Sequence, residues 1–332
     1  MSRWFAWKSG NTSYFGKNDE SVEKFQKPWN FDMGLELVET SYFGFCVPEA
    51  NIACDIYHWF HPKLGVASGG ISMFKGKKIN PILAEYMDWR NYQPMPDDLT
   101  DCTYATGVRI DMIDQSKEWR ISFEDQNEGV AFEFTSRAIM PPAFRPNGGH
   151  LCQALKNNGT LLHEGKEYRI DSYYTMDRSW GPPRSERRND IPPPGWSVGV
   201  FDDHFAFHAF AYDSPSQNAD QAQRYPDITE GSHAMWGYIW DGERLRGMKD
   251  CHKLTTREPD GIFPQSLQLR IIDEINCVHD FTGTIIGRNP IFPWPNMGGT
   301  MCFVRWSTGS RTRYGCFQEA LYSRWARDHW RA

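Results

Sequence analysis

The sequence predicts a mainly β protein of antiparallel strands with few short helices. In seven segments apolar and polar residues alternate with period two, and short turns rich in Gly, Asp and Asn separate these segments. Successive side chains of a strand point to opposite faces, so such alternation indicates half-buried strands. Helical spacing is confined to short stretches. The best of them is residues 317–330, where apolar residues return every three or four positions.

Each of the alternating segments is expected to form a strand or a hairpin. In chain order they are residues 104–113, 118–125, 130–139, 161–174, 197–212, 235–247 and 265–275.

The length of 332 residues favours two domains, each with its own core. Pro and Gly are densest at residues 140–149 and 181–196, and either stretch could be a seam between them. We place the division at residues 1–170 and 171–332. Two closed β-barrels or sandwiches in tandem fit the number of strands, because closure removes exposed strand edges.

Charge and length of apolar runs exclude several classes of partner. The net charge of −6 and a pI near 5.9 give no electrostatic reason to expect nucleic acid. No apolar run reaches about 20 residues, so we expect no stable membrane insertion and a cytoplasmic, soluble protein. The eight cysteines are scattered singly, which predicts reduced, buried thiols. The sequence leaves a homodimer open.

The motifs of nucleotide cofactors and of serine hydrolases are missing. There is no Gly-x-Gly-x-x-Gly, no phosphate-binding Gly-Lys-Ser/Thr and no Gly-x-Ser-x-Gly, and we therefore expect no cofactor. Aromatic residues make up 15% of the chain. Beyond filling a core, so many aromatic side chains suit the lining of a pocket for a small hydrophobic ligand.

Asp177 is the first candidate for a working carboxylic acid. It follows the aromatic residues Tyr173 and Tyr174 and precedes Trp180, and strand parity places Tyr173 on the same face. A carboxyl group in an aromatic, water-poor pocket can hold its proton at neutral pH and donate it to an alkene or a leaving hydroxyl. The alternative is structural: Asp177 caps the following turn or pairs with Arg178 or Arg184.

Residues 41–62 form a second constellation of polar residues in an aromatic run. Glu49, Asp55 and His58 offer acid or base groups there, although a solvated barrel rim would have the same composition. His204 and His208 are four residues apart, and so they share one face of a strand at a spacing too long for one small ion. We expect them to be structural or to take part in acid–base work, and we predict no metal site.

Four segments resemble a known family. Residues 41–70, the stretches 137–150 and 174–184, and residues 289–322 resemble bacterial proteins built from a pair of uncharacterised domains. Those proteins are distantly similar to the carotenoid 1,2-hydratase (hydroxyneurosporene synthase) and kievitone hydratase group. The resemblance implies two consecutive lipocalin-like β-barrels with a ligand pocket, and a cofactor-independent hydration, dehydration or isomerisation of an apolar alkene.

The resemblance also assigns residues. The acidic residue of the hydratases corresponds to Asp177, and their following aromatic-Gly pair corresponds to Trp180 and Gly181. Their usual histidine is replaced here by Arg178, and their tyrosine two positions before the acid by Thr175.

These observations lead to one function and two alternatives. We predict a hydratase, dehydratase or isomerase, that is a lyase or isomerase, acting on a C=C bond of a hydrophobic isoprenoid, steroid or aromatic compound. The alternatives are a non-catalytic lipocalin-like carrier of an apolar metabolite and an interaction module with exposed aromatic residues. In the enzyme, Asp177 is the acid, Glu49 or His58 handles water, and the substrate-binding residues are Tyr173, Trp180, Arg178, Trp59, His204 and His208.

Overall fold

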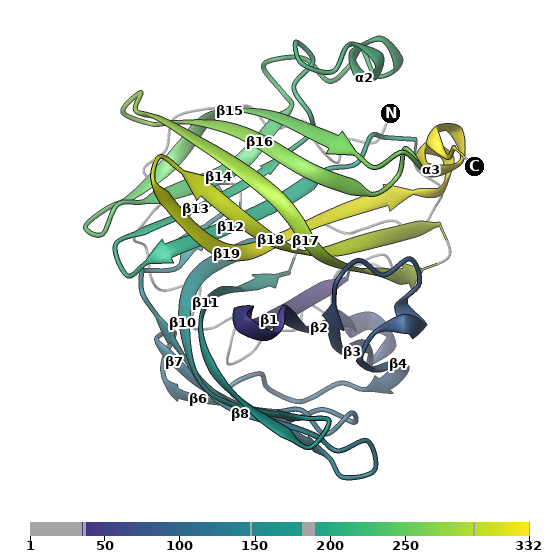
Figure 1. Ribbon diagram of the computed structural model, residues 1–332, viewed down its shortest axis with the longest axis vertical. Coiled ribbons are helices and arrows are strands. Elements are labelled where there is room, and N and C mark those ends of the chain that lie inside the picture. Colours follow the sequence, from purple (N-terminus) through teal and green to yellow (C-terminus); the bar gives the residue numbers. More distant parts are fainter. Residues whose placement is uncertain (1–34, 36–37, 147, 181–189, 295, 332) are drawn as a thin grey trace. The chain divides into compact units, whose positions relative to one another are not determined.

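The computed structural model describes residues 35, 38–146, 148–180, 190–294 and 296–331. They form two compact units, one up to Trp180 and one from Asp190. Figure 1 shows that both are built almost entirely of strands, which confirms the predicted mainly β class. Among the described residues, none of the helices combines the length and apolar character that a membrane crossing requires.

The N-terminal unit is a single antiparallel sheet of 11 strands in the order β4-β3-β2-β1-β11-β10-β8-β7-β6-β5, with β9 paired to β10. Three single-turn helices connect its strands. The elements are β1 (Glu39–Val47), η1 (Pro48–Ala50), β2 (Ile52–His61), η2 (Pro62–Leu64), β3 (Val66–Lys75), η3 (Pro81–Leu83), β4 (Tyr86–Pro94), β5 (Asp101–Thr103), β6 (Arg109–Asp114), β7 (Glu118–Asp125), β8 (Val130–Ala138), β9 (Ala143–Phe144), β10 (His150–His163) and β11 (Lys166–Ser179).

The sequence explains the two sharp connections beside β2. Pro48 and Pro62 each open a 3₁₀ turn, where the fixed φ of proline fits the first helical position. Asn51 and Gly65 end these turns with φ of 53° and 70°, the left-handed conformation that Asn and Gly tolerate best. The three strands β1, β2 and β3 are thereby folded back on one another as neighbours in the sheet.

The C-terminal unit is a closed barrel of eight strands, β12 to β19 in sequence order, with β12 paired to β19. Its elements are β12 (Gly195–Asp202), β13 (Phe205–Ala211), α2 (Ala219–Arg224), β14 (Ala234–Trp240), β15 (Leu245–Arg257), β16 (Pro264–Asp273), β17 (Val278–Trp294), β18 (Met297–Thr308), β19 (Arg311–Tyr322) and α3 (Ser323–His329).

Three expectations differ from the structure. The sheet of the N-terminal unit is curled but, within the described residues, it is not closed, since β4 and β5 each have one neighbour in it. The expected division at 170/171 falls inside β11, which pairs with β10 along its whole length, so the described residues divide between Trp180 and Asp190. Residues 317–322 are strand rather than helix, because they pair with β18 as the barrel closes, and only Ser323–His329 is helical.

Each unit has its own hydrophobic core. In the barrel, alternate residues of β13 such as Phe207 and Ala209 point inward and pack with Trp306 and Phe317. In the N-terminal unit the corresponding cluster includes Phe45 and Trp119. All eight cysteines are free thiols, as predicted, and only Cys277 is exposed.

Candidate functional site

Asp177 lies in β11, which is flanked in the sheet by β1 and β10. Its register partners are Tyr42 in β1 and Cys152 in β10. Only 4% of the residue is exposed, and its Oδ2 lies 4.0 Å from Nε2 of His150. The structure therefore places this carboxyl group in a buried position beside an imidazole. Arg184 and Gly181, which the sequence analysis set next to it, lie outside the described residues.

A second buried carboxyl group, Asp55 of β2, lies on the same face of the sheet. Tyr42, the register neighbour of Asp177, donates its hydroxyl to Oδ1 of Asp55 at 2.5 Å. The hydroxyl of Tyr174 donates to the same oxygen at 3.1 Å and lies 3.4 Å from the hydroxyl of Tyr42. We call Asp55, Tyr42 and Tyr174 the Asp55 cluster.

Burial dominates the protonation of Asp55. It raises the pKa of Asp55 to about 6, although the hydrogen bonds from Tyr42 and Tyr174 stabilise the ionised form and oppose the rise. Near neutral pH this carboxyl group can therefore both give and take a proton. A pKa close to the working pH is what efficient acid–base catalysis requires.

A glycine makes room for the cluster. Gly44 is the register partner of Asp55. A Cβ added to Gly44 would lie 2.4 Å from a ring carbon of Tyr174, so any other residue would push this ring away. The absence of a side chain at this position of β1 is what allows Tyr174 to cross from β11 and reach Asp55.

Aromatic rings extend the same face along β2. The ring of Tyr57 meets that of Tyr42 edge to face at 5.2 Å, and the ring of Trp59 lies 5.0 Å from Tyr57. Both residues are at least nine-tenths buried. Trp59, which the sequence analysis selected for substrate binding, thus belongs to the aromatic row that continues from the Asp55 cluster. Such rings can stabilise a developing cation.

His58 and Arg178 lie on the opposite, core-facing side of the sheet. His58 stacks on Tyr104 at 3.6 Å, and burial lowers the pKa of His58 to about 3, so the imidazole is neutral. Arg178 forms a fully buried ion pair with Glu39 and donates to the carbonyl oxygens of Thr40 and Ser179. These contacts join β1 to β11, and they suit a structural role for Arg178.

Glu49, Tyr173 and Trp180 lie in three different surroundings. Glu49 is exposed in the turn η1, beyond the far end of β1. Tyr173 is half-buried beneath the ammonium group of Lys156, which lies 4.3 Å from the ring centre. Trp180 packs against the hydrophobic core of the N-terminal unit. Of the three residues predicted to catalyse, the structure buries Asp177 and His58 on different faces and leaves Glu49 in solvent.

The remaining two predicted residues belong to the barrel. His204 is exposed in the turn between β12 and β13. His208 is fully buried beside the ring of Trp236 at 4.4 Å, and burial lowers the pKa of His208 to about 3. Neither ring nitrogen of His208 has a hydrogen-bond partner among the described residues. The neutral imidazole faces away from the barrel core, because its neighbours Phe207 and Ala209 face inward.

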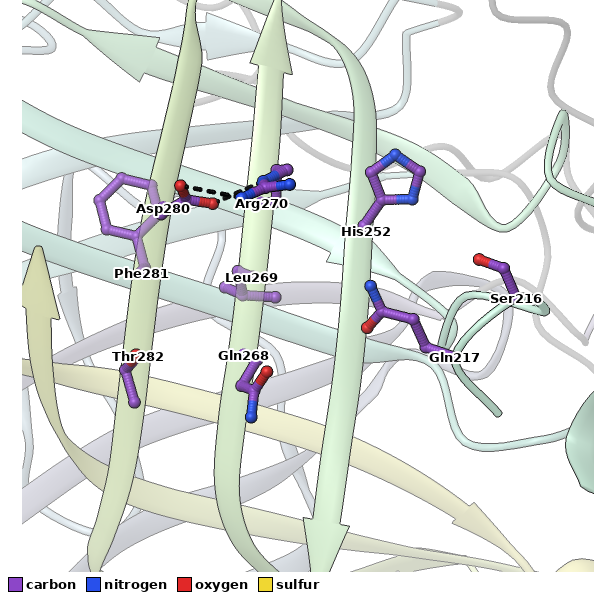
Figure 2. Close-up of a pocket in the computed structure, with 9 residues that line it drawn as sticks. All are labelled: Ser216, Gln217, His252, Gln268, Leu269, Arg270, Asp280, Phe281 and Thr282. Atoms are coloured by element: carbon purple, nitrogen blue, oxygen red, sulfur yellow. Dashed lines mark hydrogen bonds and ion pairs between the residues drawn. The ribbon is translucent and has the colours of Figure 1, made fainter. Parts of the chain in front are cut away.

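A groove on the outside of the barrel is a separate feature (Figure 2). It has a volume of about 540 Å³ and runs over β15, β16 and β17 to the loop before α2. Its polar walls include His252 and the ion pair of Arg270 with Asp280, at 2.8 Å. Next to it, Glu230, His233 and His252 form the one group of three possible metal ligands among the described residues.

Sequence reasoning passed over the residues of these two places. Asp55 was noted but not selected, although a lone Asp within the apolar strand 52–60 is a signal for a buried carboxyl group. No sequence pattern pointed to Tyr42 or Tyr174, because Asp55, to which both donate, is 13 and 119 residues away in the chain. The Glu-x-x-His spacing of Glu230 and His233 was visible in the sequence and was not used.

Comparisons with known proteins identify relatives of this fold. The model of a family described as a domain of unknown function (DUF7064) matches residues 32–321. The search of curated proteins found no match. Kievitone hydratase from Nectria haematococca has a similar structure, with a TM-score of 0.56 and 14% identity over 97% of this chain and 99% of that chain.

Two further solved structures are similar. A protein described as AttH from Nitrosomonas europaea has a TM-score of 0.52 and 11% identity over 95% of this chain and 99% of that one. CghA has a TM-score of 0.52 and 11% identity over 86% and 88%. At such identities the similarity establishes a shared fold. The likeness to the kievitone hydratase fold is confirmed, whereas the likeness to carotenoid hydratases and the paired-domain description remain predictions.

Proposed function

We propose that this chain, which belongs to the DUF7064 family, is a cofactor-independent hydratase, dehydratase or isomerase acting on a C=C bond of a hydrophobic isoprenoid, steroid or aromatic compound. The observation that carries the proposal is the pair of buried carboxyl groups, Asp177 and Asp55, on either side of Tyr42 on one face of the sheet. Similarity to the fold of a protein named kievitone hydratase supports this class of reaction.

In the proposed hydration, Asp177 donates its proton to one alkene carbon. The positive charge that develops on the other carbon is stabilised by the aromatic row of Tyr57 and Trp59. A water molecule attacks this carbon and passes a proton to Asp55. The pKa of Asp55, about 6, leaves this carboxyl group mainly ionised at neutral pH, and so it can accept the proton. Dehydration is the same sequence in reverse.

The proposed mechanism changes the roles that the sequence analysis gave to Glu49, His58 and Arg178. Asp55 takes the water-handling role that the sequence analysis gave to Glu49 or His58, because Glu49 is exposed and His58 is on the other face. His150 lies beside Asp177 and can return a proton to it after turnover. Arg178 is assigned to structure, through its ion pair with Glu39.

The test begins with the purified chain and a panel of terpenoid, steroid and phenolic alkenes and alcohols, with mass spectrometry to detect gain or loss of water. On a substrate found in this way, we expect Asp177→Asn to lower kcat by about 10²–10⁴-fold. Asp171→Asn is the matched control, since it makes the same chemical change on the same strand at a partly exposed position paired with Lys156.

Full turnover by Asp177→Asn would refute the proposed mechanism. If no compound of the panel is converted but one binds with the same affinity to the wild-type protein and to Asp177→Asn, the chain is a carrier of an apolar metabolite. Circular dichroism and thermal unfolding of every variant separate loss of chemistry from loss of folding.

A further inference from the structure

Three side chains with metal-binding groups converge at the rim of the barrel groove. Each of Glu230, His233 and His252 offers one ligand atom, and these atoms lie within 4.8 Å of one another. Oε2 of Glu230 is 3.7 Å from Nδ1 of His233. Two imidazoles and one carboxylate are the donor set that Zn²⁺ and similar divalent ions take in catalytic sites with an open position.

Local structure brings the three residues together. The backbone N–H groups of Ser232 and His233 both donate to the carbonyl of Thr229, which forms one tight turn and places Glu230 and His233 on the same side. The carbonyl of His233 accepts from the N–H of Tyr212, so the turn is tied to the end of β13.

The third residue comes from the barrel wall. His252 projects from β15 to the outside, because its neighbour Cys251 is part of the barrel core. Figure 2 shows His252 at the end of the row formed by β17, β16 and β15, on the side of the groove nearest to Ser216 and Gln217. The backbone N–H of Ser216 donates to Oε1 of Glu230 at 2.6 Å, so the groove wall also orients the carboxylate.

The atoms around the ring of His233 favour a bound cation. His233 is fully buried, and its Nε2 lies 2.8 Å from the carbonyl oxygen of Cys251. If this nitrogen carries the proton, Nδ1 has a lone pair that faces the carbonyl of Thr229 at 3.2 Å and the carboxylate of Glu230. Nδ1 of His233, the carbonyl oxygen of Thr229 and a carboxylate oxygen of Glu230 then lie close together without a proton between them. An imidazole whose N–H is held by a backbone carbonyl while its other nitrogen faces a carboxylate is the arrangement of a metal-ligating histidine.

A second carboxylate supports both imidazoles. Oδ2 of Asp250 is 3.7 Å from Nε2 of His252, and its Oδ1 is 3.9 Å from Nε2 of His233. Both distances are longer than a hydrogen bond, so Asp250 acts on the two imidazoles through its charge. The charge of Asp250 adds to that of Glu230 and attracts a divalent cation to this corner of the barrel.

We propose that Glu230, His233 and His252 bind one divalent transition-metal ion of the Zn²⁺ type, with the remaining coordination position open to the groove. In a tetrahedral site the ligand atoms would be roughly 3.3 Å apart, so small rotations of the partly exposed side chains of Glu230 and His252 complete the geometry. The open position would hold water or an oxygen atom of a compound bound beside Gln268 and Thr282. This site is independent of the carboxyl groups of the N-terminal unit.

Metal titration of the full chain tests the proposal. After treatment with a chelator and dialysis, we expect Zn²⁺ to bind with a stoichiometry of one per chain by isothermal titration calorimetry, and Co²⁺ to give the visible absorption of a four- or five-coordinate ion. His252→Gln and Glu230→Gln are expected to weaken binding at least tenfold. Both side chains are partly exposed, so the barrel should fold without them.

Gln268→Ala is the control, since it alters the same groove without removing a ligand. Its affinity for Zn²⁺ should equal that of the wild-type chain. The proposal is overturned if the wild-type chain shows no saturable uptake of Zn²⁺. It is also overturned if His252→Gln and Glu230→Gln bind the ion as tightly as the wild-type chain. Neither result depends on turnover, so the test is separate from that of the proposed enzyme.

Discussion

The hydroxyl of Tyr42 donates a 2.5 Å hydrogen bond to Oδ1 of Asp55, from one buried strand to its neighbour. This bond ties the protonation of Asp55 to the position of one phenol ring. It also connects the two carboxyl groups of the proposed active site, because Tyr42 is the register partner of Asp177.

Tyr42→Phe should raise the pKa of Asp55. The hydroxyl stabilises the ionised carboxylate, so its removal adds to the effect of burial, which already raises the pKa of Asp55 to about 6. Because the proposed base works when ionised, activity should fall as pH decreases through this pKa. In Tyr42→Phe we expect the acidic limb of the kcat/KM profile, where activity is lost as pH decreases, to move to higher pH by about one unit. Tyr168→Phe is the control, since Tyr168 of β11 is partly buried and its ring lies 4.5 Å from the ammonium group of Lys166. An unmoved limb in Tyr42→Phe would contradict the assignment of Asp55.

Asp55 should make the N-terminal unit less stable as pH rises. Its folded-state pKa of about 6 is above the ordinary value of 3.8, so the folded state holds the proton more tightly. The free energy of unfolding therefore decreases between pH 4 and pH 6, by up to about 3 kcal/mol. Asp55→Asn cannot titrate and should lack this contribution. Urea unfolding of both proteins at pH 4.5 and 7.5 measures it, and an equal change in the two proteins would disprove it.

Gly44→Ala should displace Tyr174 from Asp55. The new Cβ would lie 2.4 Å from the Tyr174 ring and 2.7 Å from the carbonyl oxygen of Cys54, which the strand cannot absorb without shifting. We expect a loss of about 1–3 kcal/mol in the free energy of unfolding and a lower kcat. At Gly298 an added Cβ would meet its nearest atom at 3.4 Å, so Gly298→Ala is the matched control. Normal activity of Gly44→Ala would show that Tyr174 need not contact Asp55.

Breaking the Glu39–Arg178 ion pair should affect stability and leave substrate affinity unchanged. Each side chain is fully buried, so Glu39→Gln or Arg178→Met alone leaves one buried charge uncompensated. We expect each change to cost about 3–5 kcal/mol, and the double variant to cost less than the sum. Thermal unfolding of the single and double variants measures the coupling. A folded Arg178→Met protein with normal stability but a raised KM would instead return Arg178 to substrate binding, as the sequence predicted.

The fold class was accessible from the sequence because period-two alternation is a local property of each strand. Segments such as 118–125 and 130–139 alternate clearly, and they are the paired strands β7 and β8. Closure of a sheet is not local. The barrel closes because β12 pairs with β19, more than a hundred residues later, and the first sheet ends at β4 and β5. Pairing with β18 likewise made residues 317–322 a strand despite their helical spacing.

In the candidate site, too, some features follow from the local sequence and others from the tertiary structure. By itself the sequence determined that Asp177 ends an aromatic strand, and that Asp55 interrupts an apolar one, since both facts depend on adjacent residues. Only the tertiary structure decided which groups meet. It placed Asp55 with Tyr42 and Tyr174, turned His58 and Arg178 to the other face, and joined the Glu230–His233 turn to His252. These encounters depend on strand register, and a shift of one residue would turn every side chain to the opposite face.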